Sequence, residues 1–322
     1  MRAIVMTENG GPDVLKVADV DLPEPGAGQV KVRVEAAGVN FIDTYQRTGQ
    51  YKVQLPYTPG MEGAGTVLAV GGGVTDVGVG ERVAWATAPG SYAQEALLPA
   101  NLVVPVPGTL GAQQAAAAML QGMTAHFLCH DTWPVKKGDT VLVHAGAGGV
   151  GLLLIQMAFR LGARVLTTVS TEEKAVLARR AGASEAILYT QVDFAAEVRR
   201  LTEGRGVDVV YDSVGKTTFE GSLDCLRPRG LLVIFGASSG AVPPFDVQTL
   251  NAKGSLFLTR PTLFHHVADR ASLVARAGAV LMQVQRGELD VRIGQTFTLD
   301  QTAEAHRALE GRKTTGKVLL LP

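Results

Sequence analysis

A glycine-rich segment is the strongest sign of chemistry in this sequence. Gly146, Gly148 and Gly151 fit the pattern G-x-G-x-x-G, between an apolar run of strand length at 140–144 and a helical pattern at 150–161. In such a turn the first glycine permits a tight bend, the second lets the backbone approach a pyrophosphate, and the third lets the helix pack on the strand. The helix N-terminus then offers unpaired N–H groups to the phosphates. The segment predicts a bound dinucleotide.

The end of the next predicted strand, 164–169, indicates which dinucleotide binds. A site for NAD carries an acidic residue about 20 residues beyond the glycines, where its carboxylate binds the ribose hydroxyls. This sequence has Ser170 there and Lys174 close behind, a hydroxyl and a cation that suit a 2′-phosphate. A structural interpretation stays open, with Ser170 as a helix N-cap, Glu173 closing a capping box and Lys174 solvated. The two interpretations are compatible, and we expect NADPH as the cofactor.

Composition limits the classes of partner. The 322 residues include 30 basic and 30 acidic residues, for a formal net charge of +0. This balance argues against nucleic acid as the main partner and against a polybasic membrane-surface role. No signal-peptide pattern and no uncharged apolar stretch of about 20 residues is present. Two distant cysteines, Cys129 and Cys225, fit a reducing compartment. We therefore expect a cytoplasmic protein without a membrane partner.

The elements that must position these residues change character along the chain. Up to about residue 121, short alternating runs predict an all-β unit, without helical periodicity before 112–119. After residue 135, strands alternate with helices, which predicts a doubly wound parallel sheet. The first group of predicted strands covers 2–6, 29–36, 65–70, 82–85 and 92–98. The second covers 140–144, 164–169, 186–190, 207–211, 231–235 and 254–259, with helices at 150–161, 172–181, 193–203 and 216–226.

The remaining elements suggest a discontinuous first domain. Beyond Arg260 the sequence predicts a helix at 268–286, a strand pair at 292–298, a helix at 302–310 and a strand at 317–321. We expect these to return to the first domain. The predicted domains are therefore 1–122 completed by 261–322, and 123–260, with the active site in the cleft between them.

Six segments, in order, resemble those of a known family over nearly the whole chain. They are GVNFIDTYQRTG (38–49), PGMEGAGTV (59–67), GAGGVG (146–151), VVYDSVG (209–215), FGASSGAV (235–242) and GSLFLTRP (254–261). The sequence resembles the zinc-independent NADPH:quinone oxidoreductases related to zeta-crystallin, in the medium-chain dehydrogenase/reductase superfamily. The resemblance implies a GroES-like β-rich catalytic domain, a Rossmann domain and a homodimer.

The residue types argue against a catalytic metal. A catalytic zinc needs three protein ligands from Cys, His or carboxylate and a fourth open position. Zinc-dependent relatives have a Cys where this chain has Asn40 and a His where it has Met61. An amide and a thioether are poor zinc ligands, and Glu62 alone builds no site. The six histidines show no metal-binding spacing, so we expect no metal.

Without a metal, the chemistry favours quinones. Hydride addition to a simple ketone produces an alkoxide, which needs a Lewis acid or a well-placed proton donor. Addition to a quinone produces a delocalised phenolate, which water or a weak donor can protonate. The sequence therefore predicts NADPH-dependent quinone reduction. Reduction of enones or enoyl thioesters, and a non-enzymatic NADPH-binding role, stay open as alternatives.

The resemblance also assigns site residues at the substrate end. It places Asn40, Phe41, Asp43 and Thr44 beside the nicotinamide, Tyr45 and Tyr51 toward the substrate, and Thr124 near the nicotinamide. Asn40, Tyr45, Tyr51 and Thr124 are the catalytic candidates, although Asn40 also suits a turn and Tyr45 also suits wall packing. Gln121 stands where close relatives have a lysine.

Further residues are expected around the cofactor. They follow strands, where doubly wound sheets bind ligands, or match family segments. Arg260 has a phosphate clamp and an ion pair as alternatives, and Lys317 a cofactor phosphate contact and a solvated position. Beyond the three glycines, Ser170 and Lys174, the candidates are Gly149, Val150, Tyr189, Ser213, Phe235, Gly236, Ala237, Ser238, Leu258, Thr259, Arg260 and Lys317. The apolar run at 255–259 predicts an edge strand that pairs across a two-fold axis.

Overall fold

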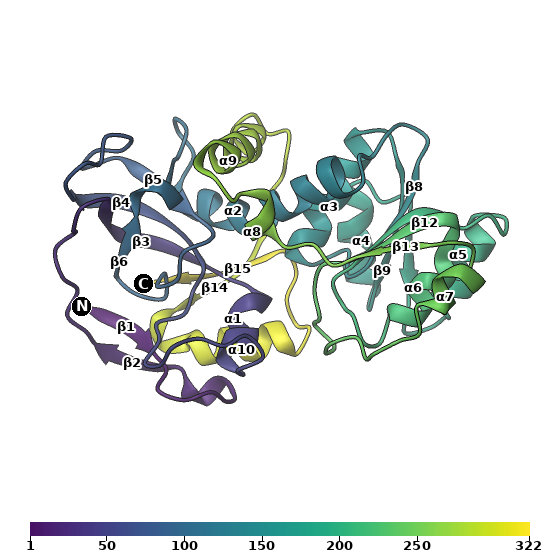
Figure 1. The fold of residues 1–322 in the computed structure, drawn as a ribbon, viewed down its shortest axis with the longest axis horizontal. Helices are drawn as coiled ribbons and strands as arrows, with labels where there is room; N and C mark the ends of the chain where they lie inside the picture. The colour runs from purple at the N-terminus through teal and green to yellow at the C-terminus, as the bar shows by residue number, and fades with distance from the viewer. The chain divides into compact units, whose positions relative to one another are not determined.

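The computed structural model describes all 322 residues and divides the chain into two compact units. Unit 1 comprises Met1–Met123 and His266–Pro322, and unit 2 comprises Thr124–His265. Both chain termini lie in unit 1 (Figure 1). No helix combines the length and apolar composition that a membrane crossing requires.

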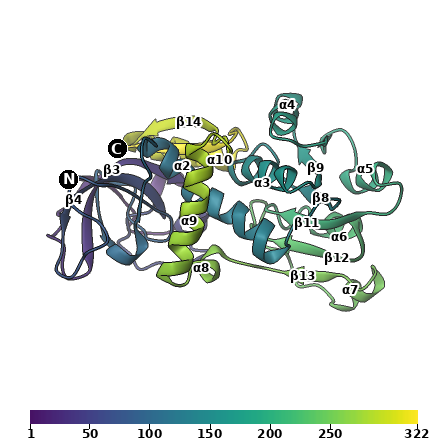
Figure 2. The ribbon, with the colours of Figure 1, turned by 90° about the horizontal axis from the view of Figure 1, so that it is seen from above.

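Unit 2 contains a six-stranded parallel sheet in the order β10-β9-β8-β11-β12-β13, of which the run from β9 to β13 can be followed in Figure 2. This is the doubly wound order predicted from the alternation of strands and helices, with its reversal between β8 and β11. Its strands are β8 (Thr140–Val143), β9 (Arg164–Val169), β10 (Glu185–Leu188), β11 (Val207–Asp212), β12 (Leu226–Ile234) and β13 (Phe257–Thr259). Its helices are α3 (Gly149–Arg160), α4 (Glu172–Arg180), α5 (Phe194–Leu201), α6 (Phe219–Cys225) and α7 (Gln248–Ala252).

The core of unit 2 explains why nearly continuous apolar runs form its strands. Both faces of a parallel sheet are covered, so residues pointing either way are apolar. On one face, Leu142 and Leu232 pack with Val198 of α5 and with Phe219 and other residues of α6. The helices α3 and α4 contact each other and strands β8 to β10. Because crossovers between parallel strands are right-handed as a rule, this strand order puts α3 and α4 on the face opposite α5 and α6.

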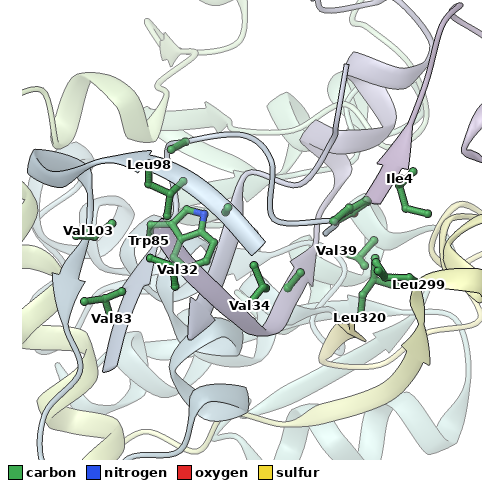
Figure 3. Packing of buried hydrophobic residues seen from close by; sticks show 14 of the residues in the cluster. Ile4, Val32, Val34, Val39, Val83, Trp85, Leu98, Val103, Leu299 and Leu320 are labelled. Carbon is green, nitrogen blue, oxygen red and sulfur yellow. The ribbon is translucent and has the colours of Figure 1, made fainter. Parts of the chain in front are cut away.

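Unit 1 is built around a seven-stranded sheet in the order β14-β15-β3-β4-β5-β7, with β6 paired to β3. A separate two-stranded sheet joins β1 and β2. The strands are β1 (Arg2–Val5), β2 (Lys16–Asp19), β3 (Gln29–Val39), β4 (Glu62–Val70), β5 (Arg82–Trp85), β6 (Glu95–Pro99), β7 (Val104–Pro105), β14 (Ile293–Thr298) and β15 (Lys317–Leu321). Figure 3 shows apolar side chains of this unit packed together, among them Val32, Trp85 and Leu320.

Strand β15 joins the two segments of unit 1. It pairs parallel to β14 and antiparallel to β3, with Val318 opposite Val39. Strand β3 also pairs with β4, with Gly38 opposite Glu62. This register brings Lys317, Asn40 and Glu62 to one end of the sheet, although 255 residues separate Lys317 from Glu62. The predicted strand pair at 292–298 was wrong, since that segment forms the single strand β14.

The remaining helices include two short ones that the sequence analysis missed, α1 (Phe41–Arg47) and α8 (Leu263–His266). Helix α1 lies in the segment for which only strands were predicted. It is short, and five of its residues are buried, so it lacks the exposed face that produces a helical periodicity. The other helices are α2 (Ala112–Phe127), α9 (Arg270–Gln285) and α10 (Thr302–Glu310).

Candidate active site

The carboxyl ends of the six parallel strands gather most of the predicted cofactor residues at one edge of unit 2. Ligands of doubly wound sheets bind at this edge, next to the strand-order reversal. The turn after β8 carries the glycines, and each of the other strands contributes at least one candidate. These are Ser170 after β9, Tyr189 after β10, Ser213 after β11, Phe235 to Ser238 after β12, Leu258 and Thr259 within β13, and Arg260 after it.

The glycine turn owes its shape to contacts that a side chain would prevent. A Cβ on Gly146 would lie 2.0 Å from Thr167 Oγ1, and one on Gly151 would lie 2.4 Å from the Ala145 carbonyl oxygen. A Cβ on Gly148 would meet only Ala145 O, at 3.1 Å. The left-handed residue of the turn is Ala145, with φ 54°. The tight bend assigned to Gly146 is therefore made by its neighbour, and Gly146 instead permits close contact with β9.

Because of these contacts, we expect substitutions of Gly148 and Gly151 to have different effects. We expect Gly151→Ala to lower the free energy of unfolding by roughly 1–3 kcal/mol, because its Cβ would meet backbone atoms. We expect Gly148→Ala to cost under about 1 kcal/mol but to weaken NADPH binding about tenfold or more, because the methyl group stands where phosphate approaches. Denaturant unfolding and nucleotide titration check both. Equal losses of stability in the two variants would contradict this assignment.

The start of α4 differs from the sequence prediction. The N-cap is Thr171, whose hydroxyl accepts the Lys174 N–H at 3.4 Å, so the prediction of Ser170 as N-cap was wrong. The Glu173 carboxyl accepts from its own backbone N–H and from the Thr171 hydroxyl, and these two bonds lower its pKa. Ser170 uses its carbonyl oxygen to accept from the Thr190 hydroxyl at 3.1 Å. The Ser170 hydroxyl is thus left out of the helix cap, at the edge where a ribose phosphate would bind.

The tips of β11 and β12 are tied together. Phe235 N–H donates to Asp212 O at 2.9 Å, and Ser238 N–H donates to Ser213 O at 3.1 Å. A Cβ on Gly236 would lie 2.6 Å from Ser213 O, so the close approach requires glycine. Ser213 and the segment from Phe235 to Ser238 therefore form one connected part of the candidate site.

A buried polar network supports this part of the edge, and the sequence analysis did not find it. His144, 1% exposed, contacts the Thr168 hydroxyl through Nδ1 at 2.8 Å and the Ser222 hydroxyl through Nε2 at 3.0 Å. Ser222 donates to Asp212 Oδ2 at 2.8 Å, and Asp212 Oδ1 accepts the Val214 N–H at 2.7 Å. Burial lowers the pKa of His144, against the opposing charge of Asp212, and so favours the neutral ring. The network holds the loop that follows β11.

In unit 1 the Asn40 amide is completely occupied by internal partners. Its Nδ2 donates to Glu62 Oε2 at 2.9 Å and to Gly38 O at 3.2 Å. Its Oδ1 accepts from Lys317 Nζ at 2.7 Å and from Gln121 Nε2 at 3.4 Å. An amide has two donor hydrogens and two acceptor lone pairs. Asn40 can thus contact nicotinamide or substrate through its side chain only if one of these bonds is exchanged.

Lys317 lies inside unit 1 and forms an ion pair with Glu62. The two side chains are 1% and 0% exposed. Glu62 also accepts the Leu120 N–H, and a Cβ on Gly38 would lie 2.1 Å from Glu62 Oε2 and 2.8 Å from Lys317 Cε. The structure therefore places Lys317 against carboxylate and amide oxygens. Neither of the two roles that the sequence suggested for Lys317, a cofactor phosphate contact or a solvated position, describes this location.

The aromatic candidates form a connected group on and after α1. The rings of Phe41 and Tyr45 are 6.2 Å apart, and those of Tyr45 and Tyr51 are 5.4 Å apart in an edge arrangement. Tyr45 is 9% exposed and Tyr51 40%. The group presents a partly exposed aromatic surface beside Asn40, whereas Thr44 is buried and bonds the Phe41 carbonyl at 2.8 Å. Thr124, also buried, is the first residue of unit 2.

The residues at the former zinc-ligand positions have other partners. The Met61 sulfur lies 3.5 Å from Gln46 Nε2 and 3.9 Å from the Tyr57 hydroxyl. No three His, Cys, Asp or Glu side chains lie together in a group that could hold a metal ion. The side chains of Asn40 and Met61 instead contact neighbouring protein groups.

Comparison with protein families gives two matches. A zinc-binding dehydrogenase model matches residues 149–271, and an alcohol dehydrogenase GroES-like domain model matches residues 26–108. A quinone oxidoreductase of Pseudomonas aeruginosa is 47% identical over 323 residues, covering 100% of this chain and 99% of that protein. A 2-haloacrylate reductase of a Burkholderia species is 45% identical over 330 residues, with 100% and 99% coverage.

Solved structures are similar over the same length. The quinone oxidoreductase of Escherichia coli complexed with NADPH has a TM-score of 0.98 and 40% identity, with 100% of both chains covered. A mycobacterial protein complexed with NADPH has a TM-score of 0.97 and 50% identity, again with 100% coverage of both. The similarity thus includes both units, each of which carries part of the predicted site.

Proposed function

Since the chain belongs to the quinone oxidoreductases of the medium-chain dehydrogenase/reductase superfamily, we propose that it reduces quinones with NADPH by hydride transfer. The observation that carries this proposal is the carboxyl edge of the unit 2 sheet. There the glycine turn, Ser170 and the joined tips of β11 and β12 provide the parts of an NADPH site. The full-length similarity to NADPH-complexed structures supports the same cofactor.

NADPH, when bound, supplies the hydride. The residues that would hold it are those of the glycine turn for the pyrophosphate and Ser170 with Lys174 for the 2′-phosphate. Tyr51, which is 40% exposed, offers an aromatic face on which a flat quinone can stack, and Tyr45 packs against it. The reduced quinone is a delocalised phenolate, which a weak donor or water can protonate. The reaction as proposed needs no zinc, because the delocalised phenolate is only weakly basic. Asn40 and Met61 are poor zinc ligands and are bonded to other groups.

A second reaction has a specific observation in its favour. The Burkholderia relative that is 45% identical is named a 2-haloacrylate reductase, and a haloacrylate carries a conjugated carbon–carbon double bond. A conjugated enone accepts hydride for the same electronic reason as a quinone, since the charge delocalises onto oxygen. Turnover of a simple enone faster than of any quinone would move this reaction to first place.

The test of the main proposal is oxidation of NADPH by the purified, chelator-treated protein, followed at the nicotinamide absorbance. We expect turnover with 1,4-benzoquinone and 9,10-phenanthrenequinone, and a preference for NADPH over NADH. Tight NADPH binding without turnover of any quinone would refute quinone reduction.

A variant of Lys174 tests the choice of cofactor. We expect Lys174→Gln to raise KM for NADPH about 10- to 100-fold, since a charge-assisted bond to the 2′-phosphate is lost. KM for NADH should stay unchanged. Arg179→Gln is the matched control, because it removes the same charge from the same helix, where Arg179 pairs with the exposed Glu172 at 2.6 Å. An equal rise of KM for NADPH in both variants would show that the overall positive charge of the helix matters, and not a specific contact of Lys174.

We further propose a cytoplasmic homodimer. Strand β13 is the edge of the unit 2 sheet, and Phe257 on it is 57% exposed. An exposed apolar edge strand is a template for pairing, and two-fold pairing would cover it. Both cysteines are buried free thiols, which supports a reducing compartment. Light scattering, which measures the mass in solution, tests the dimer. We expect the mass of two chains for the protein and a lower mass for a Leu258→Pro variant, because proline blocks a strand hydrogen bond.

A further inference from the structure

A continuous chain of hydrogen-bonded side chains crosses the interior of unit 1. Arg47 binds Glu310 through two bonds of 3.0 and 2.7 Å and contacts His306 Nδ1 at 3.1 Å. His306 Nε2 lies 3.2 Å from the Tyr92 hydroxyl, which lies 3.0 Å from Asp43 Oδ2. Glu310 is 35% exposed, whereas the other four side chains are at most 2% exposed. This series of hydrogen bonds thus leads from Glu310 at the surface to the buried carboxylate of Asp43.

The direction of every proton in this chain is fixed by chemistry. A guanidinium can only donate, so His306 Nδ1 must accept from Arg47. The neutral ring then carries its hydrogen on Nε2 and donates it to the Tyr92 oxygen. Tyr92 in turn donates its hydroxyl hydrogen to Asp43. Burial, and then the charge of Arg47, lower the pKa of His306 to about 3, which agrees with a neutral ring.

The inner end of the chain reaches the candidate active site. Asp43 Oδ2 accepts the Asn40 N–H at 2.8 Å, and Oδ1 accepts the Met61 N–H at 3.2 Å. These amides belong to the residues just before α1 and just before β4. One carboxylate therefore joins the two segments that carry the Asn40 amide and the Glu62 carboxylate.

We propose that Asp43, Tyr92 and His306 are positioning residues for quinone reduction, because they keep a buried carboxylate as the acceptor that fixes Asn40 and Met61. The inference rests on the proposed function for its kinetic test. All hydrogen-bonding partners of Asp43 donate to it. Arg47, which can only donate, prevents the direction of these hydrogen bonds from reversing. A protonated Asp43 would have no acceptor for its hydrogen and would release at least one of its partners.

Several groups act on Asp43 besides its direct partners. Burial is the largest effect and raises the pKa of Asp43 to about 6, whereas the charge of Lys317 of β15 favours the ionised form. Burial is the largest effect that raises the pKa of Tyr92, and the charges of Asp43, Glu62 of β4 and Tyr57 raise it further. His306 of α10 is neutral, and the charge of Arg47 of α1 is paired with Glu310. Asp43 is therefore the group of this cluster that changes charge near pH 6.

The experiment compares two tyrosine-to-phenylalanine variants. With NADPH and 1,4-benzoquinone, we expect kcat of the wild type to fall as the pH falls through about 6. Tyr92→Phe removes a bond to the ionised carboxylate and should move this acid limb upward by about one pH unit. Tyr57→Phe is the matched control, because its hydroxyl donates to Gln46 Oε1 at 3.2 Å and makes no bond to Asp43. Its acid limb should stay at the wild-type position.

A pair of His306 variants gives an independent readout should Tyr92→Phe not fold. Glutamine can accept from Arg47 and donate to Tyr92, so His306→Gln should keep the wild-type acid limb. Leucine lets the Tyr92 hydroxyl turn and accept from a protonated Asp43, so His306→Leu should move the limb upward. An unmoved limb in Tyr92→Phe or His306→Leu, or an equal movement in Tyr57→Phe, overturns the proposal.

A titration without NADPH separates this inference from the proposed function. In protein labelled with ¹³C at the aspartate carboxyl carbon, we expect one resonance to titrate near pH 6 and to move upward in Tyr92→Phe but not in Tyr57→Phe. If the wild type reduces no quinone but this shift occurs, the proposed function fails while the hydrogen-bonded chain stands. If quinone is reduced and no aspartate titrates in this range, the inference fails.

Discussion

Lys317→Met is expected to lower the free energy of unfolding by about 3–5 kcal/mol, because removal of one partner of a buried ion pair leaves the other without compensation. Glu62 is 0% exposed and would keep only its bonds to Asn40 and the Leu120 N–H. The change should appear as a lower denaturant midpoint with an unchanged m-value. The rate of quinone reduction should also fall, because the Asn40 Oδ1 loses the hydrogen bond from Lys317 Nζ at 2.7 Å.

Two further variants decide whether burial is the cause. Lys253→Met removes an ion pair with Asp224 whose side chains are 28% and 51% exposed, and it should cost at most about 1 kcal/mol. Glu62→Gln combined with Lys317→Met should recover most of the lost stability, since no buried charge remains unpaired. A double variant as unstable as Lys317→Met would assign the loss to packing of the lysine chain instead of charge.

His306→Gln is expected to make the protein more resistant to acid. The pKa of His306 falls from 6.5 to about 3 on folding, because the ring is buried. The unfolded chain therefore takes up a proton between these values while the folded chain does not, and stability is lost as the pH falls through this window. The full loss amounts to about 5 kcal/mol at roughly 1.4 kcal/mol per pH unit, and about 2 kcal/mol of it by pH 5. Glutamine does not titrate, so the variant should escape this loss.

Asp43 changes the pH dependence of the free energy of unfolding in the opposite direction. Its contribution must therefore be separated from that of His306. Its pKa rises on folding from 3.8 to about 6, so its contribution is largest below 3.8 and disappears as the pH rises through 6. Both proteins retain Asp43, and its effect cancels in their difference. Urea unfolding of wild type and His306→Gln at pH 7 and pH 5 gives that difference. If both proteins lose the same stability between these pH values, His306 is not the acid-sensitive group.

The sequence predicted unit 2 well because its information is local. Apolar runs, glycines and helical periodicity specify the six strands and helices α3 to α6, although the short helix α7 was not predicted. Parallel pairing then brings all carboxyl ends of the strands to one edge. The glycine turn and the positions of Ser170, Ser213 and Phe235 at that edge follow directly. The N-cap at Thr171 was missed by one residue, because serine and threonine are both good caps.

Unit 1 was predicted less completely because its polar contacts depend on distant pairing. Nothing near Lys317 in the sequence indicates that β15 inserts beside β3, and only this register sets its amine against Glu62 and Asn40. Tyr92 and His306 showed no signal either, since they come from a loop and a helix 214 residues apart. Motif analysis finds residues that act close together in sequence, whereas burial and strand order decide these partnerships.

The discontinuity of unit 1 has a consequence for the order in which the chain is made. Unit 2 is a single stretch, Thr124–His265, and can fold as soon as it leaves the ribosome. The first segment of unit 1 emerges earlier, yet its sheet lacks β14 and β15 until His266–Pro322 has been translated. During that interval Glu62 has no lysine and Tyr92 has no histidine. The domain that begins synthesis first is thus expected to be completed last, with its buried charges exposed to water until β15 arrives.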